Sequence, residues 1–472
     1  SVCNQMDRLL SDTMPSLSSA SQCWRVQIVL RVNLHPPAHS DVELITQRLK
    51  PLSFFSRREF WSMVHMSSQP VCRGNDLSVQ VCVIGAGPVG ATLACRLAVA
   101  GISVAVVDRV PLPAMEHPDF DGRAYAIAAG PVKLLREAGV WERLPLPPCP
   151  IESILVTDGR PGEAPSPLSL EFGREDAEEP FGLMTEARAL RVALNQSLNG
   201  LENIHVLAPV DVSVARHADG AIVTASSGHR IKAQLIVAAD GRQSRTRAAA
   251  GIPITKLPYG QTGIVCAIAH EMPHNNSALE HFLPGGPFAR LPMAGNAEYP
   301  NLSAIVWSDG DAIVRRIAEL PAPAFAREIQ RRMGHDLGDI TPVGRRWVYP
   351  LSAQYAQRYT DTRLVLAGDA AHGIHPIAGQ GLNLGFRDVI QLSDLLIEAA
   401  GQGRDLGEAA LLAQYQRRCR PANMVMLAAT DTLDRLFSND NPILRFARDI
   451  GIAGVQRLPR LRKAFVRHAM GV

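Results

Sequence analysis

One segment combines an apolar strand, a glycine turn and a helix, and it limits the possible folds more than any other feature of the chain. Residues 79–90 read VQVCVIGAGPVG, in which an apolar run precedes Gly85, Gly87 and Gly90 at the spacing G-x-G-x-x-G. Helix-forming residues follow as far as Gly101, and a second apolar run comes after that glycine. This order of strand, glycine turn, helix and strand predicts a βαβ unit of a parallel sheet.

An acidic residue closes the second of these strands. Asp108 lies 18 residues after Gly90. At this position a carboxylate accepts hydrogen bonds from the ribose hydroxyls of an adenine dinucleotide, while the helix N-terminus favours its phosphates. We therefore expect an adenine-dinucleotide site. The glycine spacing does not choose between NAD and FAD.

Two later segments each place an aspartate at the end of an apolar strand. Residues 235–247 read LIVAADGRQSRTR and contain Asp240, while residues 363–388 read RLVLAGDAAHGIHPIAGQGLNLGFRD and contain Asp369. Taken alone, the first is equally typical of any strand that ends in an Asp-Gly turn. An acid at a strand end can bind a ribitol hydroxyl, and a glycine loop that enters a helix presents backbone N–H groups to an anionic group.

Together, the three segments resemble the flavin-dependent aromatic hydroxylases typified by p-hydroxybenzoate hydroxylase, in the same order along the chain. Within that superfamily, the loop GDAAHGIHPIAGQGLNLGFRD is similar to the UbiH/UbiF-type hydroxylases of ubiquinone biosynthesis. The resemblance covers about residues 79–472. It includes DGRAYAIAAG at 121–130, HFLPGGPFARLP at 281–292 and TDTLDRLFSND at 430–440.

The resemblance implies a set of FAD-binding residues. The ADP half of FAD would be held by Gly85, Gly87, Gly90 and Asp108. Arg123 and Arg188 would contact the pyrophosphate and ribityl region, and Asp369 would bind the ribityl chain and the pyrophosphate side. Asp240 would lie where both FAD and the pyridine nucleotide approach. The backbone at Gly381, Leu382 and Asn383 would face the pyrimidine edge of the flavin. For the two arginines, sequence alone favours an ordinary surface position.

The resemblance also implies the activity. It predicts an FAD-dependent monooxygenase that consumes NAD(P)H and O2 and hydroxylates the ring of a polyprenyl phenol intermediate in ubiquinone biosynthesis, through a flavin hydroperoxide. Because the cofactor carries this chemistry, no catalytic residue is predicted, and no metal is expected. Two alternatives stay open: a flavin hydroxylase of a small soluble aromatic, and a non-catalytic accessory protein that binds FAD and lipid.

Two histidines lie in the loop before the last glycines. His372 and His375 are candidates for acid–base work because histidine titrates near neutral pH. Alternatively, they brace the loop, and this second interpretation is the one we favour.

The predicted fold class is α/β, with a Rossmann-like FAD-binding domain interleaved with a mostly antiparallel β-sheet substrate domain, followed by C-terminal helices. The FAD-binding domain is assigned to residues 79–153, 186–256 and 351–400, and the substrate domain to residues 154–185 and 257–350. Residues 1–78 read as a poorly structured N-terminal extension, and residues 401–472 as a C-terminal helical segment.

Composition limits the partners. Of 472 residues, 46% are hydrophobic, and the net charge of +3 argues against a nucleic-acid partner. Residues 417–472 nevertheless hold eleven Lys/Arg against four Asp/Glu, a local balance of +7. This pattern is typical both of a solvated charged face and of a helix on an anionic membrane surface, and the resemblance favours the membrane.

Eight scattered cysteines without a paired motif indicate a reducing compartment. We therefore expect a cytoplasmic protein, in peripheral contact with the inner membrane surface through residues 417–472. A protein complex of ubiquinone biosynthesis is a further expected partner.

Overall fold

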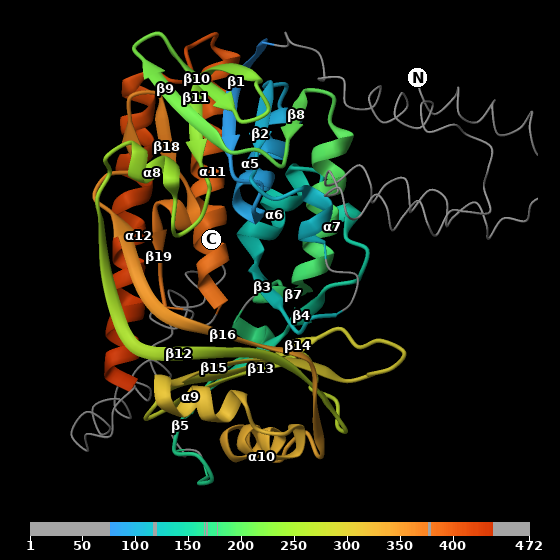
Figure 1. Cartoon of the computed structure of the whole chain (residues 1–472). Coiled ribbons are helices and arrows are strands. Elements are labelled where there is room, and N and C mark those ends of the chain that lie inside the picture. The colour runs from blue at the N-terminus through green and yellow to red at the C-terminus, as the bar shows by residue number, and fades with distance from the viewer. Residues whose placement is uncertain are drawn as a thin grey trace, which may run out of the picture. The chain divides into compact units, whose positions relative to one another are not determined.

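The computed structural model describes residues 76–437, except 117–119, 165, 167–168, 177 and 376–378. The expected N-terminal extension up to residue 75 and the last part of the C-terminal segment therefore lie outside the described residues. Two large sheets and a small one make up the described part (Figure 1).

The first large sheet is built on parallel strands, as the glycine segment predicts. Its order is β17-β18-β11-β1-β2-β8, and two antiparallel pairings extend it, of β10 with β11 and of β9 with β10. The strands are β1 (Asp76–Ile84), β2 (Val104–Val107), β8 (Ile204–Leu207), β9 (Val212–His217), β10 (Gly220–Ala225), β11 (Arg230–Ala238), β17 (Thr360–Asp361) and β18 (Leu364–Leu366). The apolar runs of β1, β2 and β18 form the centre of one continuous core, because strands covered on both faces are apolar throughout.

Helices from distant parts of the chain cover this parallel sheet. They are α5 (Pro88–Val99), α6 (Ala129–Glu137), α7 (Ala187–Gly200) and α11 (Gln380–Gly401). Helix α5 contacts each of the other three, and α11 also packs against α12 (Ala409–Phe437). The short helix α8 (Arg245–Ala249) follows β11.

The second large sheet, which we call the mixed sheet, has the order β19-β16-β12-β15-β14-β13-β5-β6. All of its pairs are antiparallel except β13 with β5, so the mostly antiparallel prediction is confirmed. Its strands are β5 (Ser153–Asp158), β6 (Leu170–Phe172), β12 (Ile254–His270), β13 (Ser277–Leu283), β14 (Gly286–Met293), β15 (Leu302–Gly310), β16 (Ile340–Ala356) and β19 (His372–Gly373).

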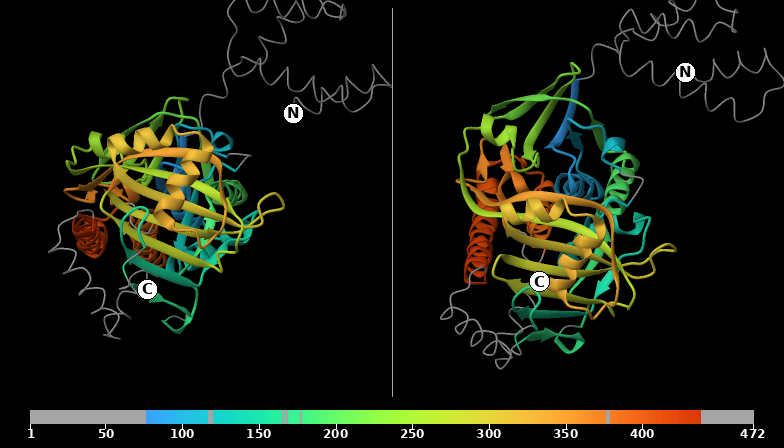
Figure 2. Two further views of the ribbon diagram at one scale, coloured as in Figure 1. Left: turned by 90° about the horizontal axis from the view of Figure 1, so that it is seen from below. Right: turned by 60° about the horizontal axis from the view of Figure 1, so that its bottom comes forward.

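Helices α9 (Asp311–Ala318) and α10 (Ala322–Met333) cover the outer face of the mixed sheet (Figure 2). The opposite face, which we call the inner face, contacts a three-stranded sheet of β3 (Ala124–Ala128), β4 (Cys149–Ile151) and β7 (Gly182–Glu186). The mixed sheet therefore has one face covered by its own helices and one turned towards the rest of the molecule.

Some elements begin elsewhere than the sequence indicates. Strand β1 starts at Asp76, within the stretch predicted as an extension, because residues 76–78 pair with Arg230, Ile231 and Lys232 of β11. Strands β12 and β16 run across the predicted limits at 256/257 and 350/351 and stay paired as far as Ile254 and Ala356. The domain limits themselves stay a prediction.

Candidate functional site

The glycine loop between β1 and α5 has the close packing that its spacing predicts. Gly85 has a φ of +108°, and a Cβ there would lie 2.4 Å from the carbonyl oxygen of Ala239. At Gly90, a Cβ would lie 2.0 Å from the oxygen of Gly85. By contrast, a Cβ at Gly87 would meet nothing within 4 Å. The first and third glycines are thus needed by the fold, whereas the second leaves space in front of the loop.

The N-terminus of α5 points its backbone donors at that space. Its N-cap, Gly87, offers no side-chain acceptor, and no acidic residue stands in the first turn. The unpaired N–H groups and the positive end of the helix dipole therefore favour an anion here, such as a pyrophosphate.

Asp108 lies at the end of β2, beside the loop. Its Oδ2 accepts a hydrogen bond from the Ala86 N–H at 2.7 Å, and its Oδ1 accepts one from the Val110 N–H at 2.8 Å. Each carboxylate oxygen has a second lone pair, so the carboxylate can still accept bonds from ribose hydroxyls.

A cavity of about 540 Å³ opens at this edge of the parallel sheet. Among its lining residues are Gly85, Gly87, Asp108, Asp240 and Gly241. Its volume is in the range of small-molecule sites. The structure therefore brings four of the expected residues together at one cavity.

Asp240 has a structural role besides lining the cavity. Its carboxylate accepts hydrogen bonds from the Ser244 hydroxyl at 2.5 Å and from the hydroxyl and N–H of Thr246 at 3.0 and 3.1 Å. These bonds hold the loop that leads into α8, so the side chain is largely occupied by its own turn.

The two expected arginines lie elsewhere and do not line this cavity. Arg123 is paired with Asp121 at 2.6 Å, and its guanidinium lies 4.3 Å above the ring of Trp347 on β16. Arg188 is paired with Glu186 at 2.5 Å, near the ring of Phe120. Of the two, Arg123 contacts the mixed sheet, through Trp347.

A third arginine, Arg191, lies at the site although it was not among the residues expected from the sequence. Arg191 follows Arg188 by one turn of α7, and its Nη1 donates a hydrogen bond to the carbonyl oxygen of Ala86 at 2.6 Å. Burial lowers its pKa, and the nearby Tyr125 and Asp108 oppose that shift. The spacing of three residues placed both arginines near one helix face, but only the fold shows that Arg191 reaches the glycine loop.

Asp369 and the start of α11 form the other end of the site. Asp369 lies in the short helix Gly368–Ala370 and is paired with Arg242 at 3.4 Å. Helix α11 begins after Gly379, which has a φ of +64° and supplies no side-chain cap, so the N–H groups near Gly381 and Leu382 have no side-chain cap acceptor from that residue.

Asn383 binds by its side chain to strand β3. Its Oδ1 accepts a hydrogen bond from the Ala128 N–H at 3.0 Å, and its Nδ2 donates one to the Ala126 oxygen at 2.9 Å. This pair of bonds holds the N-terminus of α11 in place against β3.

Both histidines of the loop are buried and bonded. His372 lies 2.6 Å from Asp388, whose other oxygen accepts a hydrogen bond from Asn423 at 2.9 Å. Burial alone lowers the pKa of His372, but the Asp388 carboxylate outweighs it and the pKa lies above its ordinary value.

The pKa of His375 is shifted in the opposite direction, below its ordinary value. Its Nε2 is 2.9 Å from the Gln261 side-chain oxygen and 3.7 Å from Asp434. Burial lowers its pKa, and Asp434 and Asp431 only partly oppose this. These contacts tie the loop to β12 and α12, which agrees with the bracing role.

The donor set fits a dinucleotide. Within the described part of the chain, no three His, Cys, Asp or Glu side chains lie close enough to hold a metal ion. The space in front of Gly87, the two uncapped helix N-termini and Asp108 together match the phosphates and ribose of FAD.

Comparison with known proteins agrees with this fit. Residues 78–430 match the family described as "FAD binding domain". The ubiquinone hydroxylase UbiL of Rhodospirillum rubrum is 45% identical over 403 residues, which cover 85% of this chain and 92% of that protein. The 3-demethoxyubiquinol 3-hydroxylase of Escherichia coli is 31% identical, over 83% of this chain and 98% of its own length.

Solved structures show the same fold. The p-nitrophenol 4-monooxygenase PnpA of Pseudomonas putida superposes with a TM-score of 0.67 at 17% identity, over 84% of this chain and 98% of that one. The chain therefore belongs to the FAD-binding family that includes these ubiquinone hydroxylases, and it is an FAD-dependent monooxygenase.

Proposed function

We propose that this protein hydroxylates the ring of a polyprenyl phenol intermediate in ubiquinone biosynthesis. The observation that carries the proposal is the 45% identity to a ubiquinone hydroxylase over nearly the whole length of both chains. When bound, FAD supplies the redox chemistry that takes electrons from NAD(P)H and activates O2. The protein binds and orients the reactants and excludes water from them.

The proposed FAD site uses the residues expected from the sequence, with one addition. Gly85, Gly87, Gly90 and Asp108 would hold the ADP half, and Arg191 would face the pyrophosphate beside the glycine loop. We assign Asp240 to the wall of the cavity and not to a direct bond, because its carboxylate is engaged by Ser244 and Thr246.

The remaining residues would hold the other half of the cofactor. Asp369 would bind the ribityl chain, and the first turn of α11, with Gly381, Leu382 and Asn383, would face the pyrimidine edge with its N–H groups. Arg123 and Arg188 would contact the pyrophosphate and ribityl region after releasing Asp121 and Glu186, with which they are now paired.

The substrate would lie against the inner face of the mixed sheet. Apolar side chains that are only half buried lie on this face, among them Val156, Val265 and Val306. An apolar ring with an isoprenoid tail gains free energy by covering such surface. This favours a polyprenyl phenol over a small soluble aromatic.

Two experiments test the proposal. The purified protein with bound FAD should oxidise NAD(P)H faster when a prenylated phenol is added, and labelled oxygen from O2 should appear in the product. A strain that lacks the gene should accumulate the quinone precursor that still lacks one ring hydroxyl. Slow oxidation of NAD(P)H that no phenol accelerates would support a non-catalytic role and contradict the proposal.

We further propose peripheral contact with a membrane, and with it a place among the proteins of ubiquinone biosynthesis. No helix of the described chain is long and apolar enough to cross a bilayer. On α12, Arg417 and Arg418 are exposed, and Val425 is 64% exposed. A basic face with an apolar residue in it can lie on an anionic surface, where the tail of the substrate would also be found.

A further inference from the structure

One buried carboxyl interrupts an apolar row on the inner face of the mixed sheet. Paired residues of neighbouring strands lie on the same face, and the pairing continues from strand to strand. The row runs across five strands through Val265, Val306, Ala289, Glu280 and Val156. Every member except Glu280 is apolar.

The alternation along β13 confirms which face Glu280 occupies. Ala278 and Phe282 pack in the cluster of the inner face, whereas Leu279 and Leu283 pack under α9 and α10. Because side chains alternate along a strand, Glu280 shares the face of Ala278 and Phe282. It therefore points away from the covering helices.

The carboxyl of Glu280 is buried, and one of its oxygens accepts no hydrogen bond from the described residues. The residue is 8% exposed, and its Oε1 has no hydrogen-bond partner among the described residues. Burial raises its pKa to about 7. An unpaired buried carboxyl is destabilising, and such groups concentrate at functional sites.

On the outer face of the same sheet, two arginine–aspartate pairs are formed. Asp336 binds Arg290 at 2.7 Å, and Asp309 lies 3.7 Å from Arg332. Partners for a carboxylate are thus provided on the outer face. On the inner face, Glu280 is surrounded in its row by alanine and valine.

One end of the row leads towards the proposed cofactor site. Val265 pairs with Trp347 of β16, and Arg123 lies over that ring. Because strands are about 4.8 Å apart, Val265 and Glu280 are separated by about 14 Å along the row. Val306 and Val156, on either side of Ala289 and Glu280, are only half buried.

We propose that Glu280 is a substrate-binding residue, the acceptor of a hydrogen bond from a hydroxyl of the substrate, whose apolar part lies along the valines of the row. This inference rests on the proposed function. The ligand class it defines is a hydroxylated aromatic with an apolar tail. Such a ligand would give Glu280 a donor that the described residues do not supply, and it would cover the half-buried valines in the same step.

The test compares two probes that differ only in the donor. Dissociation constants of ortho-prenylphenol and its methyl ether are measured on the FAD-loaded protein from the change in flavin absorbance. At about pH 9, where the Glu280 carboxylate is ionised, the wild type should prefer the phenol by about tenfold or more, because hydrogen bonds to charged groups are the strong ones. Glu280→Gln keeps the shape and a neutral acceptor, so the preference should fall about fivefold. Glu280→Leu should remove it.

Asp158→Asn is the matched control. Asp158 pairs with Phe282, so its buried carboxyl lies on the same face, one row away. This variant should keep the wild-type preference. FAD content and melting temperature verify that each variant is folded, and Glu280→Gln alone decides the question if Glu280→Leu does not fold.

The outcomes separate this inference from the proposed function. An unchanged preference in Glu280→Gln, with ring hydroxylation intact in the wild type, contradicts the role of Glu280 alone. Loss of preference in Asp158→Asn, with no change in the Glu280 variants, also contradicts it. If ortho-prenylphenol neither accelerates NAD(P)H oxidation nor gains oxygen in the wild type, the proposed function itself is wrong.

Discussion

At the scale of single residues, the three glycines of the loop between β1 and α5 differ in what they do. Gly85 and Gly90 are required by contacts within the protein, since a Cβ at either would lie within 2.4 Å of a backbone oxygen. Gly87 has open space before it and a φ of −61°, which any residue can adopt. We therefore assign Gly87 a role in ligand binding and not in stabilising the fold.

This difference predicts opposite results for two substitutions. Gly87→Ala should fold with nearly the wild-type melting temperature but bind FAD about tenfold or more weakly, because a methyl group would occupy the approach of the pyrophosphate. Gly90→Ala should lower the melting temperature as well. Flavin absorbance per protein and thermal unfolding measure the two effects. Equal FAD affinity in Gly87→Ala would contradict the assignment.

Glu280 makes a second prediction at this scale. Its pKa is raised from 4.5 to about 7 in the folded protein. Between these values the folded protein holds a proton that the unfolded chain has lost, so the contribution of Glu280 to stability is present at low pH and is lost as the pH rises towards 7.

Glu280→Gln cannot ionise and should not show this loss. From about pH 4 to about pH 8, the free energy of unfolding of the variant should improve relative to that of the wild type by about 3 kcal/mol. Urea unfolding of both proteins at each pH measures the difference, and other titrating groups cancel in the comparison. Parallel pH curves would show that Glu280 has an ordinary pKa.

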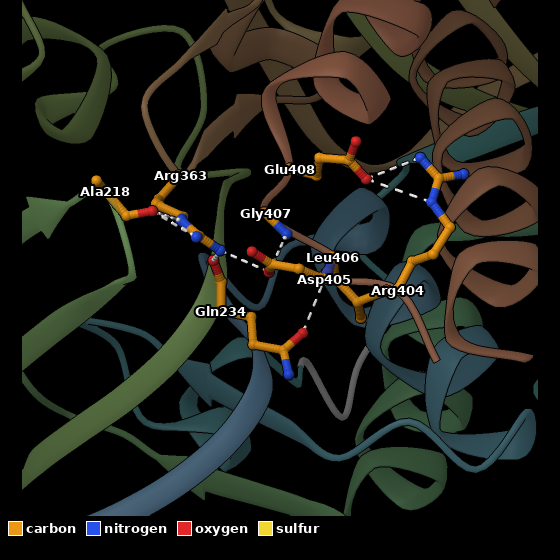
Figure 3. A network of polar contacts seen from close by, with 8 residues as sticks. All are labelled: Ala218, Gln234, Arg363, Arg404, Asp405, Leu406, Gly407 and Glu408. Carbon is orange, nitrogen blue, oxygen red and sulfur yellow. Dashed lines mark hydrogen bonds and ion pairs between the residues drawn. The ribbon is translucent and has the colours of Figure 1, made fainter. Parts of the chain in front are cut away.

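At the scale of elements, a buried arginine joins three parts of the parallel-sheet region (Figure 3). Arg363, in the turn between β17 and β18, donates hydrogen bonds to the oxygen of Ala218 after β9, to the oxygen of Gln234 in β11 and to Asp405 before α12. Its side chain is 8% exposed. The contact fixes where the chain passes from α11 to α12.

Arg363→Met should therefore lower the free energy of unfolding by about 2–4 kcal/mol, because it leaves buried carbonyl groups and a carboxylate unpaired. Arg404→Met is the control, in the loop between α11 and α12 that Arg363 contacts through Asp405. Arg404 pairs with Glu408 at 2.8 Å, but both side chains are more than 40% exposed, so this loss should stay within about 0.5 kcal/mol. Denaturant unfolding measures the free energy of unfolding of both variants. Similar losses in the two would show that the burial of Arg363 is not what makes its contacts stabilising.

At the scale of the whole molecule, the basic excess of residues 417–472 allows a test of membrane contact. The full chain should co-sediment with vesicles of anionic phospholipid at low salt and be released at high salt, while neutral phosphatidylcholine vesicles should bind it weakly. The double variant Arg417→Glu, Arg418→Glu should bind about tenfold or more weakly with unchanged FAD content. Absence of binding by the wild type at low salt would remove the membrane proposal.

The sequence by itself determined the parallel sheet and the glycine loop of a dinucleotide site, whereas the choice of FAD came from the resemblance to the flavin hydroxylases. The sheet and the loop rest on short segments, such as residues 79–90, whose chemistry is complete within a few neighbouring positions. Strand limits were less accurate, because β1, β12 and β16 are extended by backbone pairing with partners far along the chain.

Only the tertiary structure decided which side chains meet. It shows that Arg191, and not Arg188 one turn earlier, reaches the glycine loop. It also shows that the Asp240 carboxylate accepts hydrogen bonds within its own turn. In the sequence, Glu280 is one acid in an apolar strand. Its place in a row of alanine and valine depends on the register of four strand pairs, and pairing over such separations is set by the packing of both faces of the sheet, which no local pattern contains.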